Sequence, residues 1–180
     1  AIDLHNHTPS SDDYQHKQPD AIDLLAKRIR EANLSVVMFT DHGQLPDGNF
    51  TSRLSDATGR LILRGAELNV FVNVWQKPPE KVDKQLFFHL LIGFDPGASR
   101  TPDYWMQHIQ HHCREEKRFA GDKEIAGLSS SIEELHEIVV DANALLIPAH
   151  LHSTPNAFKS RSIDDIYADP PFLKHARDHF

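Results

Sequence analysis

Two histidines and three acidic side chains lie within the stretch DLHNHTPSSDD at the start of the chain. His5 and His7 are separated by one residue, so in extended backbone both imidazoles point to the same side and can bind one ion. Histidine is the commonest metal ligand in proteins. By itself a His-x-His pair is a weak indication of a metal site, so the prediction depends on whether other ligands come to the same place.

Further residues of metal-ligand type follow or interrupt apolar runs along the chain. They are His42, Glu67, His89 and His150. Taken singly, a histidine between Phe88 and Leu90 is more typical of a hydrogen-bonded core residue than of a ligand. Glu67 taken singly could be a surface acid or a helix cap. Independent structural roles would not place the same chemistry at successive strand ends, so the joint occurrence favours a metal centre.

The elements that would position these residues alternate between strands and helices. Apolar residues recur at helical spacing after Asp20, which can cap the helix, and Asn33 can end it. The run 35–40 is apolar without alternation, as expected of a strand covered on both faces of a parallel sheet. We predict helices over 19–33, 104–118 and 131–143, and strands over 1–4, 35–40, 61–69, 86–93 and 144–149. This order predicts an α/β fold with a parallel sheet or barrel, in which reactive groups gather at the carboxyl ends of the strands.

Four motifs occur in a family-specific order: DLHNHT, FTDH, GAE and IPAH. In these motifs the chain resembles the polymerase and histidinol phosphatase (PHP) family, over residues 1 to about 152. The resemblance implies a distorted (β/α)7 TIM-like barrel, incomplete at the C-terminal end of this chain. It also implies a cleft with two or three metal ions that hydrolyses phosphoesters.

The resemblance implies a ligand set for each ion. His5, His7 and Glu67 would hold the first metal, and Glu67, His89 and His150 the second. Asp12 and His42 would serve a third, and the catalytic roles would fall to Glu67, His42 and Asp12. A carboxylate can bridge two cations about 3.5–4 Å apart, which suits Glu67, and mixed nitrogen and oxygen ligands suit Zn, Mn or Fe. We expect in-line attack on phosphorus by a metal-held hydroxide.

One departure from the family concerns the Asp-x-His pair that usually ends the barrel. Near residue 180 the chain has Asp178 and His179, which are adjacent and not alternating. Either the final strand lies beyond this chain or the third site is altered. We therefore expect residues 1–180 to form a single PHP-like metal-binding domain that is part of a longer polypeptide.

Several other residues have chemistry that this ligand set does not use. His108 and His112 are separated by four residues on a predicted helix and could share a metal, but the acid of an HExxH motif is missing. A solvated or substrate-facing surface is the favoured interpretation of that helix. Asp41 and Asp3 are expected to orient neighbouring histidines. The candidate phosphate contacts are Arg64, Arg100, Arg114, Lys117, Arg118 and Arg161.

Composition limits the class of protein. The chain of 180 residues has a net charge of -7, which disfavours a general phosphate-binding surface, since nucleic-acid affinity usually depends on clustered Lys and Arg. Bound cations could reverse this locally. With one cysteine and no apolar run long enough to span a bilayer, we expect a cytoplasmic protein without a membrane partner.

Three functions compete. The leading hypothesis is a metal-dependent phosphoesterase for phosphomonoesters or phosphodiesters, with nucleic acid among the candidate substrates and a fused or associated ATPase module as a candidate partner. An amidohydrolase also begins with His-x-His, although it would normally place a bridging lysine on a middle strand. The third hypothesis is a metal-binding regulatory or assembly domain that has lost catalysis.

Overall fold

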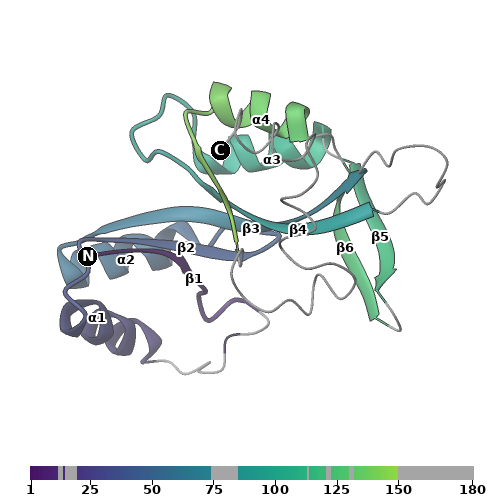
Figure 1. Ribbon diagram of the computed structural model, residues 1–180. Coiled ribbons are helices and arrows are strands. Elements are labelled where there is room, and N and C mark those ends of the chain that lie inside the picture. The colour runs from purple at the N-terminus through teal and green to yellow at the C-terminus, as the bar shows by residue number, and fades with distance from the viewer. Residues whose placement is uncertain are drawn as a thin grey trace, which may run out of the picture.

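The computed structural model describes residues 1–11, 14, 20–73, 85–112, 114–120, 123–129 and 132–149. Strands and helices alternate over most of this length (Figure 1). In chain order they are β1 (Ile2–Asn6), α1 (Ala21–Glu31), β2 (Val36–His42), α2 (Gly48–Thr58), β3 (Leu61–Asn73), β4 (Gln85–Gly93), α3 (Pro102–His112), β5 (Arg114–Ala120), β6 (Lys123–Ser129), α4 (Ile132–Asp141) and β7 (Leu145–Pro148). Among the described residues, no helix is long and apolar enough to cross a membrane.

The central strands form a curled sheet in the order β1-β2-β3-β4-β7. β1, β2 and β3 are parallel, whereas β4 runs antiparallel to both β3 and β7. β6 pairs with the end of β3 and antiparallel with β5, off this path. The result is a mixed α/β fold in which five strands form a half-barrel, consistent with an incomplete barrel (Figure 1).

The expectation of a parallel sheet is wrong for β4. Only residues 74–84 separate β3 from β4. A parallel return needs a crossover of about a dozen residues or more, usually with a helix, whereas antiparallel neighbours need only a short connection. The pairing places Asn69 opposite His89 and Glu67 opposite Leu91. His89 therefore lies within an antiparallel strand and not at the end of a parallel one.

The helices cover the outer face of the sheet in two clusters. α3 and α4 pack on the outward residues of β3 and β4, including Ala66, Leu68 and Ile92. α1 and α2 pack on Val37 and Phe39 of β2 and on Ile62 of β3. Ile62 and Ala66 share a parity in β3, so both clusters lie on one face, and residues of the other parity, Glu67 among them, face inward.

On the inner face of the sheet, the side chain of Met38 packs against Gly65 and Gly93. Gly65 and Gly93 are directly paired across β3 and β4. A Cβ at Gly93 would overlap the sulfur of Met38, and a Cβ at Gly65 would overlap the carbonyl oxygen of Ile92. Met38 is fully buried. The glycine of the GAE motif is therefore required by close packing of backbone against backbone two residues before Glu67.

Two helices end as the sequence predicts. α1 lies within the predicted range 19–33, and Asn33 adopts a left-handed φ of 50° just after it. The Leu34 N–H donates to Ile29 and the Asn33 N–H to Arg30, which satisfies carbonyls at the helix end. Asn143 ends α4 in the same way. Asp20 lies at the N-cap of α1, but its side chain accepts no cap hydrogen bond.

Three elements differ from the prediction. The helix predicted over 104–118 is wrong beyond residue 112, because β5 begins at Arg114 and pairs with β6. Neither β6 nor α2 was predicted from the sequence. α2 is mostly polar, with only Thr51 and Leu54 buried, and it is defined by Asp47, whose side chain accepts from Asn49, and by left-handed Gly59. Arg114, Lys117 and Arg118 consequently belong to a strand and not to a helix surface.

Candidate metal centre

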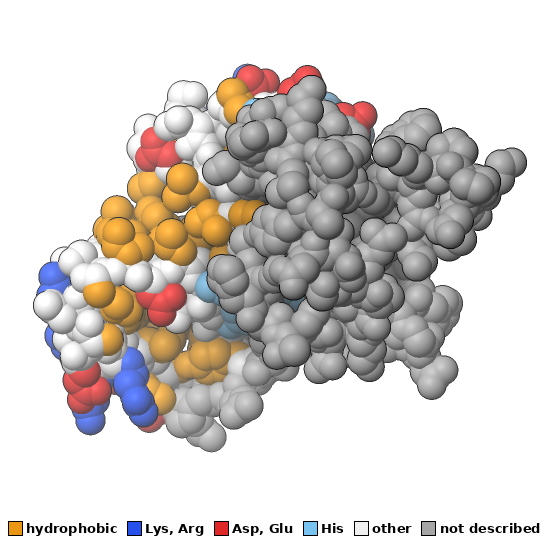
Figure 2. Space-filling view, viewed as in Figure 1, with side chains coloured by type: hydrophobic (Ala, Val, Ile, Leu, Met, Phe, Trp, Pro, Cys, Tyr) orange, Lys and Arg blue, Asp and Glu red, His pale blue; other side chains and the backbone are white. Residues whose placement is uncertain are grey.

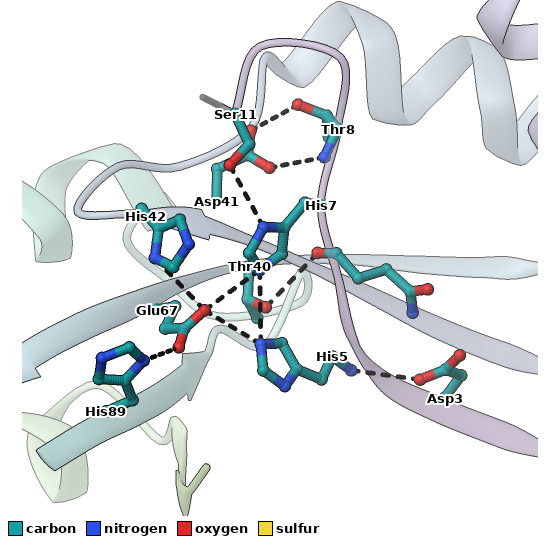
Figure 3. A network of polar contacts seen from close by, with 11 residues as sticks. Asp3, His5, His7, Thr8, Ser11, Thr40, Asp41, His42, Glu67 and His89 are labelled. Atoms are coloured by element: carbon teal, nitrogen blue, oxygen red, sulfur yellow. Dashed lines mark hydrogen bonds and ion pairs between the residues drawn. The ribbon is translucent and has the colours of Figure 1, made fainter. Parts of the chain in front are cut away.

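A buried carboxylate lies at the centre of four imidazoles (Figure 3). Glu67 is 1% exposed. Its Oε2 lies 3.0 Å from His5 Nε2 and 3.1 Å from His7 Nε2. His42 Nδ1 is 3.4 Å from the same oxygen, whereas His89 Nδ1 contacts Oε1. The structure thus brings together the five described residues of the predicted ligand set.

Strand register explains how these side chains meet. His42 at the end of β2 is paired with Glu67 on β3. His89 lies opposite Asn69, two positions from the partner of Glu67, so the two side chains are diagonal neighbours on the inner face. The register between β1 and β2 shifts between Asp3 and Asn6. Such a bulge re-aims side chains, and here it includes His5 and comes just before His7.

The electrostatics of the site favour an ionised glutamate. Burial raises the pKa of Glu67, but the hydrogen bonds with His5 and His89 and the charges of His89 and His42 outweigh it. The pKa of Glu67 is therefore well below its ordinary value. A buried anion among nitrogen ligands is the arrangement expected of a cation site.

The spacing of the ligand atoms fits a metal ion. Glu67 Oε2, His5 Nε2 and His7 Nε2 form a triangle with sides of 3.0, 3.1 and 3.4 Å. Ligands about 2.0–2.1 Å from a tetrahedral Zn²⁺ would be about 3.3 Å apart. These three residues form a group whose ligand atoms all lie within 4.8 Å of one another. His89 approaches the other oxygen, so the carboxylate has one oxygen available on each side.

Neighbouring polar residues hold the loop that carries His7. The Ser11 hydroxyl is 3.3 Å from His7 Nδ1, the ring nitrogen directed away from Glu67 (Figure 3). Thr8 and Ser11 are each only 1% exposed. A partner on the second ring nitrogen fixes the orientation of a metal-binding imidazole. Ser11 was not among the predicted site residues, although it lies in the polar turn that follows the His-x-His pair.

Asp41 does not have the expected role of orienting His42. Its carboxylate is fully buried and accepts from the Thr8 N–H at 2.7 Å and from the Thr8 hydroxyl at 2.5 Å. Adjacent residues of a strand point to opposite faces, so Asp41 is directed away from the side occupied by His42. Asp3 accepts the backbone N–H of His5 at 3.3 Å. Both acids therefore position the backbone that carries the histidine pair.

The cluster borders a cleft of about 510 Å³. Its lining residues are His5, Asn6, His7, Tyr14, Leu25, His42, Glu67 and His89. Burial raises the pKa of Tyr14, so its phenol is a neutral hydrogen-bond donor beside the cluster. Histidine side chains are visible at the surface near the middle of Figure 2, next to hydrophobic side chains.

Two predicted ligands, Asp12 and His150, lie outside the described residues, as does the Asp178-His179 pair. The third metal site and the complete ligand set of the second metal ion therefore stay predictions. Arg64 belongs to the outer parity of β3, and it contacts Asp103 Oδ2 at 2.7 Å, Asp103 Oδ1 at 3.0 Å and the Pro46 carbonyl at 3.0 Å. It is thus a link between β3 and α3, on the face away from the cleft.

Comparison with known proteins supports the fold. No family model matches the chain, and no curated protein matches it in sequence. Among solved structures, a "putative metal-dependent phosphoesterase" from Bifidobacterium adolescentis superimposes with a TM-score of 0.59 and 16% identity. The match covers 99% of this chain and 74% of the other. At this identity the likeness establishes the fold alone.

Proposed function

We propose that the protein is a metal-dependent phosphoesterase of the PHP type. The observation that carries the proposal is the buried Glu67 carboxylate, whose two oxygens face imidazoles from the region of β1, from β2 and from β4. The name of the structural neighbour supports the same class of chemistry.

The residues divide naturally around the two carboxylate oxygens. His5 and His7 would hold one divalent ion with Glu67 Oε2, and His89 with His150 would hold a second with Oε1. His42 and Asp12 would serve a third. Zn, Mn and Fe suit this mixture of imidazole and carboxylate. When bound, such ions supply Lewis-acid polarisation of the phosphoryl group and a water of lowered pKa.

The protein residues supply binding and orientation. Glu67 stays ionised, Ser11 fixes the ring of His7, and the buried Asp41–Thr8 contact holds the loop between β1 and α1. With neutral imidazoles, the described ligands contribute one formal negative charge, that of Glu67, so a divalent ion held by them leaves this group of ligands positive. This offsets the net charge of -7 and lets an acidic protein bind a phosphoester. Both phosphomonoesters and phosphodiesters, including nucleic acid, are candidate substrates.

One observation disfavours the amidohydrolase alternative. Among the described residues that line the cleft there is no lysine, whereas that chemistry normally uses a bridging lysine. The remaining alternative is a regulatory or assembly domain that binds metal without catalysis, and the experiment below distinguishes it from a phosphoesterase.

The test compares Glu67→Gln with wild type and with Glu31→Gln, a control at a position 57% exposed on α1. After loading with Zn²⁺ or Mn²⁺, bound metal is measured by mass spectrometry, and hydrolysis is measured with p-nitrophenyl phosphate and its diester. Wild type and Glu31→Gln should bind metal tightly and hydrolyse one of the two, and Glu67→Gln should lose both the tightly bound metal and the hydrolysis. Metal binding without hydrolysis in wild type would favour the regulatory domain. Equal hydrolysis in all three proteins would remove Glu67 from the mechanism.

A further inference from the structure

A row of planar side chains begins just before α3, continues along it, and does not line the cleft. Arg100, Tyr104, His108 and His112 are spaced four residues apart. The Arg100 guanidinium carbon lies 4.4 Å from the centre of the Tyr104 ring. The Tyr104 and His108 rings are within 10° of parallel, and the ring centres of His108 and His112 are only 4.0 Å apart.

The row lies on the opposite side of the sheet from the metal centre. α3 packs on the outer face of β3 and β4 through Met106 and Ile109, whereas Glu67 faces inward. In Figure 1, α3 and α4 lie together on one side of β3 and β4. His108 is half-buried and His112 is exposed. Solvent ions can therefore reach the pair without entering the cleft.

Side chains four residues apart on a helix are neighbours, and two histidines at this spacing are an established way to present two nitrogens to one ion. The close approach of the rings means that both imidazoles are already on the same face. The neutral imidazole is the form that binds metals.

We infer that His108 and His112 form a separate metal site on α3, open to solvent and distinct from the cleft. It would hold one divalent ion that prefers imidazole ligands, such as Zn²⁺, Ni²⁺ or Cu²⁺. Among the described residues, three ligand atoms within 4.8 Å of one another occur only at His5, His7 and Glu67. Within the described part of the chain the α3 site therefore has two protein ligands, with water in the remaining positions. It binds more weakly than the cleft and exchanges its ion with solvent.

The test uses the full chain, Zn²⁺ as the probe, and equilibrium dialysis with metal analysis over a range of concentrations. The variants are His112→Gln and, as a matched control on the same turn, His111→Gln. His112→Gln should weaken one class of sites by about tenfold or more, because a two-point attachment becomes a single one. His111→Gln should behave as wild type. Glu67→Gln should retain this weaker site, which makes it independent of the proposed activity.

A second measurement keeps the inference falsifiable if binding classes overlap. Added Zn²⁺ should shift the ring-proton resonances of His108 and His112 together in the nuclear magnetic resonance spectrum of Glu67→Gln, at concentrations that leave His111 unshifted. Retention of wild-type binding by His112→Gln, or an equal loss in His111→Gln, would overturn the assignment. Independent shifts of His108 and His112 would also do so.

Discussion

Asp41→Asn tests whether a residue that cannot reach a metal nevertheless sets the metal affinity. The Asp41 carboxylate is fully buried and accepts two hydrogen bonds, both from Thr8. Asparagine keeps the shape and one oxygen but turns the other acceptor into a donor, facing either the Thr8 N–H or its hydroxyl. The loop from Thr8 to Ser11 contains the hydroxyl that contacts His7 Nδ1.

The expected magnitudes follow from those contacts. A hydrogen bond to a charged group contributes about 1.5–3 kcal/mol, and an unsatisfied buried donor costs about 1–3 kcal/mol. We therefore expect the free energy of unfolding to fall by about 2–4 kcal/mol, which combines one lost bond with a partly relaxed donor. Loss of orientation in a partner of a metal-binding histidine should weaken metal affinity by about 10–100-fold.

The assay combines urea unfolding of the metal-free chain with Zn²⁺ titration. Thr8→Val completes a double-mutant cycle, and a coupling energy of about 0.5–3 kcal/mol is expected because the two side chains are in direct contact. Glu31→Gln is the control, because Glu31 lies on α1 with its side chain 57% exposed. If Asp41→Asn loses stability but binds metal as wild type does, the inferred link from Asp41 through the loop to His7 is wrong.

Three further outcomes are expected. Folding lowers the pKa of Glu67, so its ionised form adds stability above the unfolded pKa of about 4.3, and this stability is lost as the pH falls below that value. Glu67→Gln should therefore show a smaller loss of stability than wild type when urea unfolding is measured between pH 7 and pH 3. Gly65→Ala should lower stability by at least about 1–3 kcal/mol because its Cβ meets the Ile92 carbonyl, whereas Gly48→Ala, which meets only the Arg64 side chain at 3.5 Å, should be tolerated in thermal unfolding. Hydrogen bonds from Arg64 lower the pKa of Asp103, but the Asp103 side chain is 57% exposed. Asp103→Asn should therefore lower the free energy of unfolding by at most about 1 kcal/mol and leave metal binding and phosphoester hydrolysis unchanged. A large loss of hydrolysis would mean that Arg64 contributes to the catalytic site.

The sequence could predict the chemistry of the site better than its geometry. His5, His7, His42 and Glu67 were identifiable because each follows an apolar run, and parallel strands deliver their ends to one edge. His89 was predicted for the same edge, yet it reaches Glu67 from the middle of an antiparallel strand. Pairing direction depends on the length of the connection and on long-range contacts, which local periodicity does not contain.

Elements whose stability comes from partners were the ones missed. β5 has the sequence REEKRFA, whose charges read as the continuation of an amphipathic helix, and only its pairing with β6 defines it as a strand. α2 buries just two side chains, so its helical pattern is weak and its caps define it. Asp41 was assigned to the wrong neighbour, because sequence adjacency to His42 suggested a contact that strand alternation forbids.

The half-barrel places three kinds of constraint on one carboxylate, and together they explain why the site tolerates a buried charge. Gly65 allows β3 to pack against β4, which brings His89 to Oε1. The β1 bulge and the Asp41–Thr8 contact turn His5 and His7 to Oε2. A lone buried carboxylate would be neutralised by a raised pKa, but His5, His42 and His89 hold the pKa of Glu67 low. The ionised form of Glu67 is thus stabilised by the same nitrogens that would bind a cation with it. A substitution that removes one of these imidazoles should therefore raise the pKa of Glu67 and lower the metal affinity together.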